Sequence, residues 1–206
     1  MSNNRMAPNL ILASQSPRRK DLLEQAGFAF EVIPGNFNEG SVPLDKPEPY
    51  ARLLAMEKAK QIANQFPDSW VIGADTVVCI KGAVLGKPHS KQDARHMLKQ
   101  LSGQTHQVVT GYALIRKAEQ KLFTDAVRTD VSFKTLSTEE IEWYIHTSEP
   151  FDKAGGYAIQ GLGSFLVKGI NGSYTNVVGL PVCEVIELLY RERIARPGRL
   201  DCWEFC

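Results

Sequence analysis

The segment WVIGADTVVCI at residues 70–80 decides the fold, because nearly every position in it is apolar. A run of this kind, without the polar alternation of a half-exposed strand, is typical of a strand covered on both faces. Lys81-Gly82 then turns the chain into a short partner strand at residues 83–85. Helices from the flanking segments must cover this sheet, which predicts a mixed α/β fold.

The remaining elements follow from apolar periodicity and turn signals on either side of this strand. Ser16-Pro17 is typical of a helix start, with Ser16 as the cap, and Gly27 of a helix end. The spacing of Ser137 and Glu140 is that of a capping box. In chain order we expect strand 9–13, helix 17–26, strand 28–33, loop 34–49, a helix from about 48 to 66, strands 70–80 and 83–85, helix 90–101, strands 107–116 and 122–133, helix 137–145, strand 165–170, a tight turn at residues 171–172 and helix 181–193.

No linker interrupts this series of elements, so the sequence predicts a single domain over residues 1–195. Its core is expected to be a twisted mixed sheet flanked by helices, with two lobes beside a cleft. Residues 196–206, which contain Cys202, Trp203 and Cys206, do not continue the last helical pattern. We expect them to form a peripheral or disordered tail.

The overall composition excludes several classes of protein. The 206 residues are 43% hydrophobic and 23% charged, which suits one substantial core. With 24 Lys and Arg against 23 Asp and Glu, the net charge of +1 lacks the positive field of duplex nucleic-acid binders. No apolar run approaches the roughly 18 residues of a membrane span, and the four cysteines form no paired CxxC clusters. We therefore expect a cytoplasmic protein without a membrane or duplex nucleic-acid partner.

Polar groups gather where the first strand gives way to the first helix, in the segment SQSPRR at residues 14–19. The hydroxyls of Ser14 and Ser16, free helix N–H groups and the guanidinium groups of Arg18 and Arg19 would converge there, which is the chemistry of an anion site. An ordinary capped helix with solvated arginines fits the local pattern equally well.

Asp75 is a carboxylate in the middle of the apolar strand, where its desolvation is costly unless something compensates its charge. A metal ion, a lysine, or a backbone bulge whose N–H groups Asp75 accepts could provide that compensation, and Gly73 is typical of a bulge or of a close backbone approach. Lys58 lies in line with the apolar stripe of its helix, and Lys87 follows the short strand beside Pro88. Each lysine alone reads as a surface residue, but together with Asp75 and the arginines they predict a polyphosphate and metal site.

The segment DKAGGYAIQG at residues 152–161 combines three glycines with polar groups that include Lys153 and Gln160. Such a loop can bend closely around a planar ligand, and the Gln160 amide offers one donor and one acceptor to a base edge. An ordinary turn with an exposed glutamine is the alternative.

Several blocks taken together resemble the Maf-like nucleoside triphosphate pyrophosphatases, in collinear order from residue 10 to about residue 190. The blocks are ASQSPRRKDLL at 13–23, EKAK at 57–60, IGADTVV at 72–78, LGKP at 85–88, LSGQTH at 101–106, DKAGGYAIQG at 152–161, INGSY, and VVGLP ending at Pro181. The resemblance implies an elongated mixed sheet in two lobes around a deep cleft, similar to that of the inosine triphosphatases. It also implies hydrolysis of nucleoside triphosphates to the monophosphate and pyrophosphate with Mg²⁺ or Mn²⁺.

The resemblance also assigns roles to single residues. Asp75 matches the catalytic aspartate of the family, as general base or as ligand of the metal, and Glu39 matches its acidic loop residue. The acidic pair usual in that loop is Asn38-Glu39 in this sequence. Phosphate-handling positions match Ser14, Arg18, Arg19, Lys58 and Lys87.

Arg18, Thr76 and Gln160 match the branch of the family that acts on dTTP and UTP. Modified pyrimidine triphosphates are expected as further substrates, and a homodimer as the assembly. The alternative function is a nucleotide-binding regulator of cell division or septum formation with little turnover.

Overall fold

The computed structural model describes residues 10–42 and 46–194 of the chain. The expectation of a peripheral tail at residues 196–206, with Cys202, Trp203 and Cys206, lies outside these described residues. None of the helices in the described ranges is long and apolar enough to cross a membrane.

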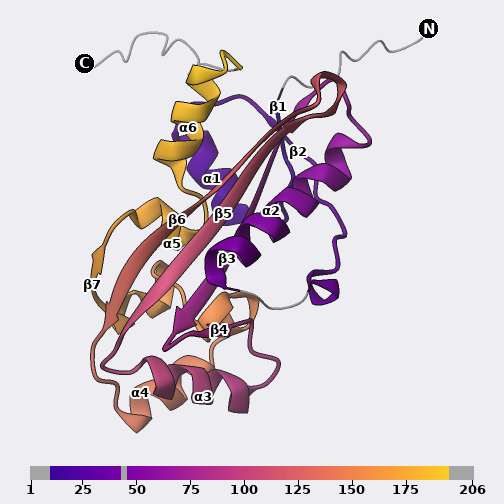
Figure 1. The fold of residues 1–206 in the computed structure, drawn as a ribbon. Coiled ribbons are helices and arrows are strands. Elements are labelled where there is room, and N and C mark those ends of the chain that lie inside the picture. The colour runs from indigo at the N-terminus through magenta and orange to yellow at the C-terminus, as the bar shows by residue number, and fades with distance from the viewer. Residues whose placement is uncertain (1–9, 43–45, 195–206) are drawn as a thin grey trace, which may run out of the picture.

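A seven-stranded mixed sheet forms the centre of the described chain, as the sequence predicts (Figure 1). Its strand order is β2-β1-β3-β5-β6-β7, with β4 paired to β3. β1 runs parallel to both β2 and β3, and all other pairs are antiparallel. The strands are β1 (Leu10–Leu12), β2 (Glu31–Val32), β3 (Trp70–Ile80), β4 (Ala83–Leu85), β5 (Thr105–Arg116), β6 (Lys121–Phe133) and β7 (Val167–Asn171).

Six α-helices cover the two faces of the sheet in the described chain. They are α1 (Pro17–Gln25), α2 (Pro47–Ala63), α3 (Lys91–Leu101), α4 (Thr138–Ile145), α5 (Tyr174–Val178) and α6 (Val182–Arg191). Figure 1 shows α1 and α6 beside one end of the long strands, α3 and α4 at the other end, and α2 along the strands between them. The long strands β3 and β5 pass through both ends, so the two lobes share one continuous sheet.

The alternation of β3 distributes its side chains over separate cores. Trp70 and Ile72 pack with α1 and α6, whereas Val78 and Ile80 pack with α3 and α4. The intervening Val71 points to the other face, against α2. Residues 70–80 therefore form a strand covered on both faces, as expected, because helices bury both of its faces.

Helix α2 lies unusually close to the sheet. A Cβ atom at Gly73 would lie 2.3 Å from the carbonyl oxygen of Ala55, and one at Gly111 would lie 2.3 Å from that of Ala51. Gly73 pairs in register with Ala113, so a bulge at this position is wrong and the close backbone approach is confirmed. This approach brings the side chains of α2 within reach of the strand.

One edge of β3 is left without a strand partner over five residues. β1 pairs with Trp70–Ile72 and β4 pairs with Val78–Ile80 of β3. Between these two partners, no described strand covers residues 73–77 on this edge. Asp75 and Thr76 lie in this gap, where the chain leaves β1 toward α1. Such a break in the sheet is where α/β proteins commonly form a ligand site.

Several predicted boundaries differ from the structure. β2 has only two residues, because β1 is itself only three residues long and offers them two partners, Ile11 and Leu12. The expected strand at 165–170 begins at Val167, because residues 161–166 form a 3₁₀ helix. Helix α2 spans Pro47–Ala63 instead of about 48–66. The turn at Asn171-Gly172 leads into the short helix α5.

Candidate active site

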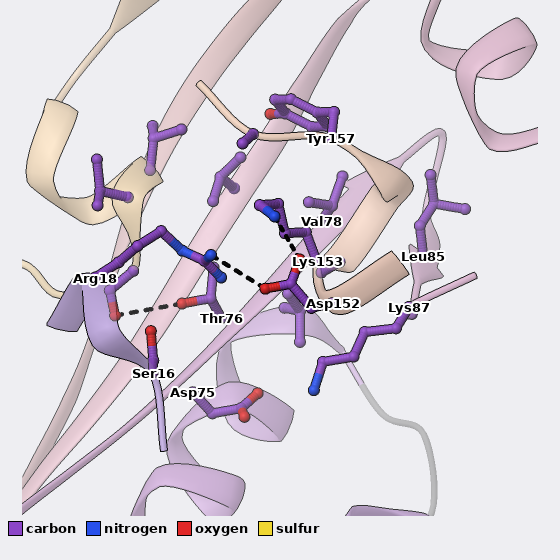
Figure 2. A pocket seen from close by; sticks show the side chains of 18 of the residues that line it. Ser16, Arg18, Asp75, Thr76, Val78, Leu85, Lys87, Asp152, Lys153 and Tyr157 are labelled. Carbon is purple, nitrogen blue, oxygen red and sulfur yellow. Dashed lines mark hydrogen bonds and ion pairs between the residues drawn. The ribbon is translucent and has the colours of Figure 1, made fainter. Parts of the chain in front are cut away.

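The uncovered edge of β3 opens into two adjoining cavities of about 320 and 430 Å³, which we call the pocket. Its charged half is lined by Lys58, Asp75, Glu39 and Lys87, and its apolar half by Val78, Leu85, Val108, Tyr157 and Ile159. Figure 2 shows Asp75 and Lys87 on one side, Val78, Leu85 and Tyr157 on the other, and Thr76 between them. The predicted residues Ser14, Ser16, Arg18, Arg19, Lys153 and Gln160 also line the pocket.

Lys58 is the group that compensates the buried carboxylate of Asp75. Its ammonium is hydrogen-bonded to Asp75 Oδ1 and lies 2.6 Å from Glu39 Oε1. Leu54 and Ile62, one turn away on either side of Lys58, are buried, and this places the lysine stem over the sheet. Of the three compensators that the sequence allowed for Asp75, the structure contains the lysine.

The environment moves the pKa values of the two carboxyl groups in opposite directions. Asp75 has only 8% of its side chain exposed, and this burial raises its pKa against the opposing charges of Lys58 and Arg19. For Glu39, burial acts in the same upward direction, but the hydrogen bond and charge of Lys58 outweigh it and lower the pKa. Asp75 is therefore the better proton acceptor of the two, and Glu39 is the more firmly ionised.

Arg19 is held from three sides. Its Nε donates to the carbonyl oxygen of Gly179 at 2.7 Å, Nη2 donates to Thr76 Oγ1 at 3.1 Å, and Nη1 lies 3.5 Å from Ser14 Oγ. Burial lowers the pKa of this guanidinium, and the charge of Asp75 opposes that shift. The result is a fixed cation that joins α1 to β3 and to the turn after α5.

Ser16 occupies the N-cap position of α1, as predicted, but its hydroxyl makes no capping hydrogen bond. Its backbone N–H donates to Ser14 Oγ at 3.1 Å instead. The cap expected from the Ser16 side chain is therefore wrong, and the Ser16 hydroxyl lines the pocket instead.

Arg18 and Lys153 meet at a residue that sequence reasoning missed, Asp152. Arg18 Nη1 lies 3.2 Å from Asp152 Oδ2, and Lys153 is hydrogen-bonded to Asp152 Oδ1. Figure 2 shows these contacts bridging the pocket between α1 and the 152–161 segment. A carboxylate at the head of a glycine-rich block was the available signal. Lys87 is exposed, and its ammonium points toward the charged half.

The 152–161 segment wraps closely over the apolar half. Gly155 and Gly156 adopt positive φ values of 70° and 69°, and a Cβ on Gly155 would lie 3.0 Å from Val78 Cγ1. Beyond these glycines, the N–H of Ala158 donates to the Tyr144 hydroxyl at 3.2 Å. Gln160 is exposed and lines the same cavity.

Glu149 holds the other side of Gln160. Its carboxylate accepts hydrogen bonds from the N–H groups of Leu162 at 2.9 Å and Gly163 at 2.7 Å, and from the Tyr144 hydroxyl at 2.8 Å. Gln160 thus sits on a short span whose two ends are anchored to Tyr144 and Glu149.

The donor set for a metal ion consists of two carboxylates. Among the described residues, no group of three or more His, Cys, Asp or Glu side chains comes together to hold an ion. Glu39 and Asp75 do converge on a single positive charge, the Lys58 ammonium. Mg²⁺ is commonly bound by one or two carboxylates plus water and substrate phosphates, so this pair fits such an ion.

A cleft with several cations beside an apolar one, on the edge of a mixed sheet, defines an α/β protein whose pocket suits a ligand with a phosphorylated part and an apolar part. Residues 9–192 match the family model described as Maf-like protein, and the chain belongs to this family.

Curated relatives extend this finding. A protein of Syntrophus aciditrophicus is 51% identical over 89% of this chain and 90% of its own length. One of Geotalea uraniireducens is 51% identical over 89% of this chain and 94% of its own length. Both are named dTTP/UTP pyrophosphatase. Among solved structures, the Ham1 protein of Staphylococcus aureus is 13% identical, with a TM-score of 0.43 over 77% of this chain and 79% of that one.

Proposed function

We propose that this chain is a pyrophosphatase that hydrolyses dTTP, UTP and modified pyrimidine triphosphates to the monophosphate and pyrophosphate. The observation that carries the proposal is 51% identity over 89% of the chain to a protein named dTTP/UTP pyrophosphatase. The pocket supports it, because one half offers cations and the other offers apolar walls and a neutral amide. A nucleoside triphosphate has the same division between its phosphates and its base.

In this proposal the charged half binds the triphosphate. Arg18, Arg19 and Lys87 neutralise phosphate oxygens, and the hydroxyls of Ser14 and Ser16 donate to them. Lys58 exchanges its carboxylate partners for phosphate oxygens as the ligand enters. The base lies against the apolar walls, where the Gln160 amide can donate to a carbonyl of uracil or thymine.

The proposed reaction is an in-line displacement at the α-phosphorus. The oxygen of a water molecule forms the new bond to this phosphorus, and the bond to the oxygen that bridges the α- and β-phosphates breaks. Asp75 either accepts the proton of the water, a role that its raised pKa supports, or holds the metal ion that activates this water. The neighbouring cations stabilise the negative charge on the departing pyrophosphate.

Mg²⁺ or Mn²⁺ is the proposed cofactor, with Glu39 and Asp75 as its protein ligands. The convergence of both carboxylates on one ammonium supports this assignment. When bound, such an ion would withdraw charge from the phosphate oxygens and make the pyrophosphate a better leaving group.

We also propose a cytoplasmic location, a homodimer, and a single domain over residues 1–195 to which residues 196–206 contribute no activity. The free thiols of Cys79 and Cys183 support a reducing compartment. Two-fold assemblies are the most frequent among soluble oligomers, which supports the dimer. The family match over residues 9–192 supports the domain limits.

The proposal is tested by incubating the purified protein with Mg²⁺ or Mn²⁺ and each nucleoside triphosphate in ¹⁸O-water, with pyrophosphate resolved from orthophosphate. We expect monophosphate and pyrophosphate, fastest with dTTP and UTP, and the ¹⁸O label in the monophosphate. Label in the pyrophosphate would place the attack at the β-phosphorus. Release of orthophosphate would indicate a phosphatase that removes single phosphates. Binding without turnover of any triphosphate would indicate a nucleotide-binding regulator.

A further inference from the structure

A chain of buried hydrogen bonds crosses the sheet from β6 to the pocket. Its inner members, Thr129, Asn176 and Thr110, are not hydrogen-bonded to a charged side chain of the pocket. At its far end, Asn176 of α5 donates from Nδ2 to Thr129 Oγ1 at 2.9 Å and to the carbonyl oxygen of Val108 at 3.1 Å. Asn176 is fully buried, so these bonds fix the start of α5 against β5 and β6.

The chain continues through two threonines on neighbouring strands. Thr110, also fully buried, hydrogen-bonds from its hydroxyl to the backbone carbonyl oxygen of Asn176 at 2.9 Å. Its Oγ1 lies 2.9 Å from Thr76 Oγ1. Thr76 Oγ1 in turn accepts a hydrogen bond from Arg19 Nη2 at 3.1 Å. Thr76 and Thr110 are directly paired in the register of β3 and β5.

The positions of the hydroxyl protons follow from this arrangement. A carbonyl oxygen can only accept, so the single proton of Thr110 is donated to Asn176. Thr110 Oγ1 must then accept from Thr76, whose own proton is thereby engaged. The other acceptor near Thr76, the Gly179 carbonyl, lies at 3.5 Å and already takes Arg19 Nε at 2.7 Å. Thr76 is left with lone pairs only, one of which already accepts from Arg19.

We propose that Thr110 is a specificity-positioning residue, because it holds the Thr76 proton and so limits Thr76 to accepting a hydrogen bond from the ligand. Thr76 lines the pocket between its two halves. A phosphate oxygen also only accepts, so Thr76 is unsuited to the phosphates. It selects a nucleoside that presents a donor at this point.

The donor that we assign is the imide N–H of uracil or thymine, an assignment that rests on the proposed function. Cytosine carries an unprotonated nitrogen at the same ring position and would set one acceptor against another. The 3′-hydroxyl of the sugar is the other donor of the nucleoside. Asn176 acts indirectly, because its backbone carbonyl oxygen accepts the hydrogen bond that the Thr110 hydroxyl donates.

The experiment measures kcat/KM for UTP and CTP in the wild-type protein and in Thr110→Val. Without the Thr110 oxygen, the Thr76 hydroxyl is free to turn and donate to cytosine. A mismatched or missing hydrogen bond of this kind costs about 1–3 kcal/mol, so the UTP to CTP ratio should fall by roughly tenfold or more. Thr110→Ser keeps the hydroxyl and should keep the ratio within about threefold of wild type.

A double-mutant cycle distinguishes an effect of Thr110 that acts through Thr76 from a general disturbance of the pocket. Thr76→Val should lower the same ratio, and adding Thr110→Val should lower it no further. An additive fall in the double variant would overturn the proposal. So would an unchanged ratio in folded Thr110→Val. Thr110→Ala replaces Thr110→Val if the latter does not fold.

Two further measurements identify the donor and test the proposed function separately from the role of Thr110. If Thr110→Val changes the ratio of dTTP to 2′,3′-dideoxythymidine triphosphate and leaves the UTP to CTP ratio unchanged, the imide assignment is overturned and the sugar hydroxyl is the donor. Absence of turnover in the wild-type protein would overturn the proposed function alone. The effect of Thr110 on Thr76 is then tested by the affinities for UMP and CMP, because the ratio of these affinities must fall in Thr110→Val.

Discussion

The two halves of the pocket are built in opposite ways. In the charged half, the cations are neutralised by the protein's own carboxylates: Lys58 by Asp75 and Glu39, and Arg18 by Asp152. In the apolar half, glycines with positive φ and hydrogen bonds to the Tyr144 hydroxyl and the Glu149 carboxylate hold the span that carries Gln160. A ligand must therefore exchange ion-pair partners in the first half, whereas the second is already arranged. We expect substitutions in the charged half to change the rate for every substrate and those in the apolar half to change the choice of base.

Asp75→Asn tests the charged half most severely. It keeps the shape of the side chain and removes its charge and basicity, and Lys58 keeps Glu39 as a partner. Hydrolysis of dTTP and UTP should fall by about 10²–10⁴-fold with a melting temperature close to wild type. Asp68→Asn, in the exposed turn before β3, is the control. Activity within about tenfold of wild type would exclude Asp75 as the catalytic carboxylate.

Lys58→Ala and Lys87→Ala divide the charged half into a buried and an exposed part. Both should lower kcat/KM by about 10²-fold for dTTP and UTP alike. Only Lys58→Ala leaves Asp75 buried without its cation, so its melting temperature should also fall, by about 5–10 °C.

Lys60→Ala, exposed on the same helix, is the control for both quantities. If folded Lys58→Ala turned over substrate at the wild-type rate, Lys58 would have a structural role and no role in catalysis.

Gln160→Glu tests the apolar half, because a carboxylate loses the donors that a pyrimidine carbonyl needs. The kcat/KM for dTTP and UTP should fall by roughly 10–100-fold, with a smaller fall for purine triphosphates. Gln65→Glu, in the exposed turn after α2, is the control. An equal fall for all nucleotides would mean that the substitution disturbs the whole segment and that Gln160 does not read the base.

Deletion of residues 199–206 is expected to have the smallest effect of all. The family match ends at residue 192, before this stretch begins. Turnover and oligomeric state should stay within about twofold of the full chain, as measured by steady-state kinetics and light scattering. A large loss of either would assign these residues to the site or to an interface.

The fold was predictable wherever the signal was local. Residues 70–80 and 83–85 form strands with the predicted limits, and the capping box at Ser137 and Glu140 is present in full. The resemblance to the Maf family is confirmed by the family match. The short β2 was not predictable, because its length depends on how much of β1 is available to pair with it.

The sequence indicated many of the residues that line the pocket, but not the contacts between them. Asp75 was conspicuous as a charge in an apolar run, and Thr110 carried a weaker form of the same signal that was overlooked. Glu39 came from the resemblance alone, since nothing in its loop shows that it meets Lys58. Asp152 was read as part of a glycine-rich block and proved to be the partner of Arg18.

The sequence by itself determined which side chains carry charge, which strand is buried on both faces, and the family to which the chain belongs. Each of these can be read from the order of the residues along the chain, without knowing which distant segments meet. Only the tertiary structure decided that Lys58 neutralises Asp75 and that the hydroxyl groups of Thr76 and Thr110 are hydrogen-bonded to each other. These contacts depend on the close approach of α2 at Gly73 and on the register of β3 against β5, which form only when the distant segments pack together.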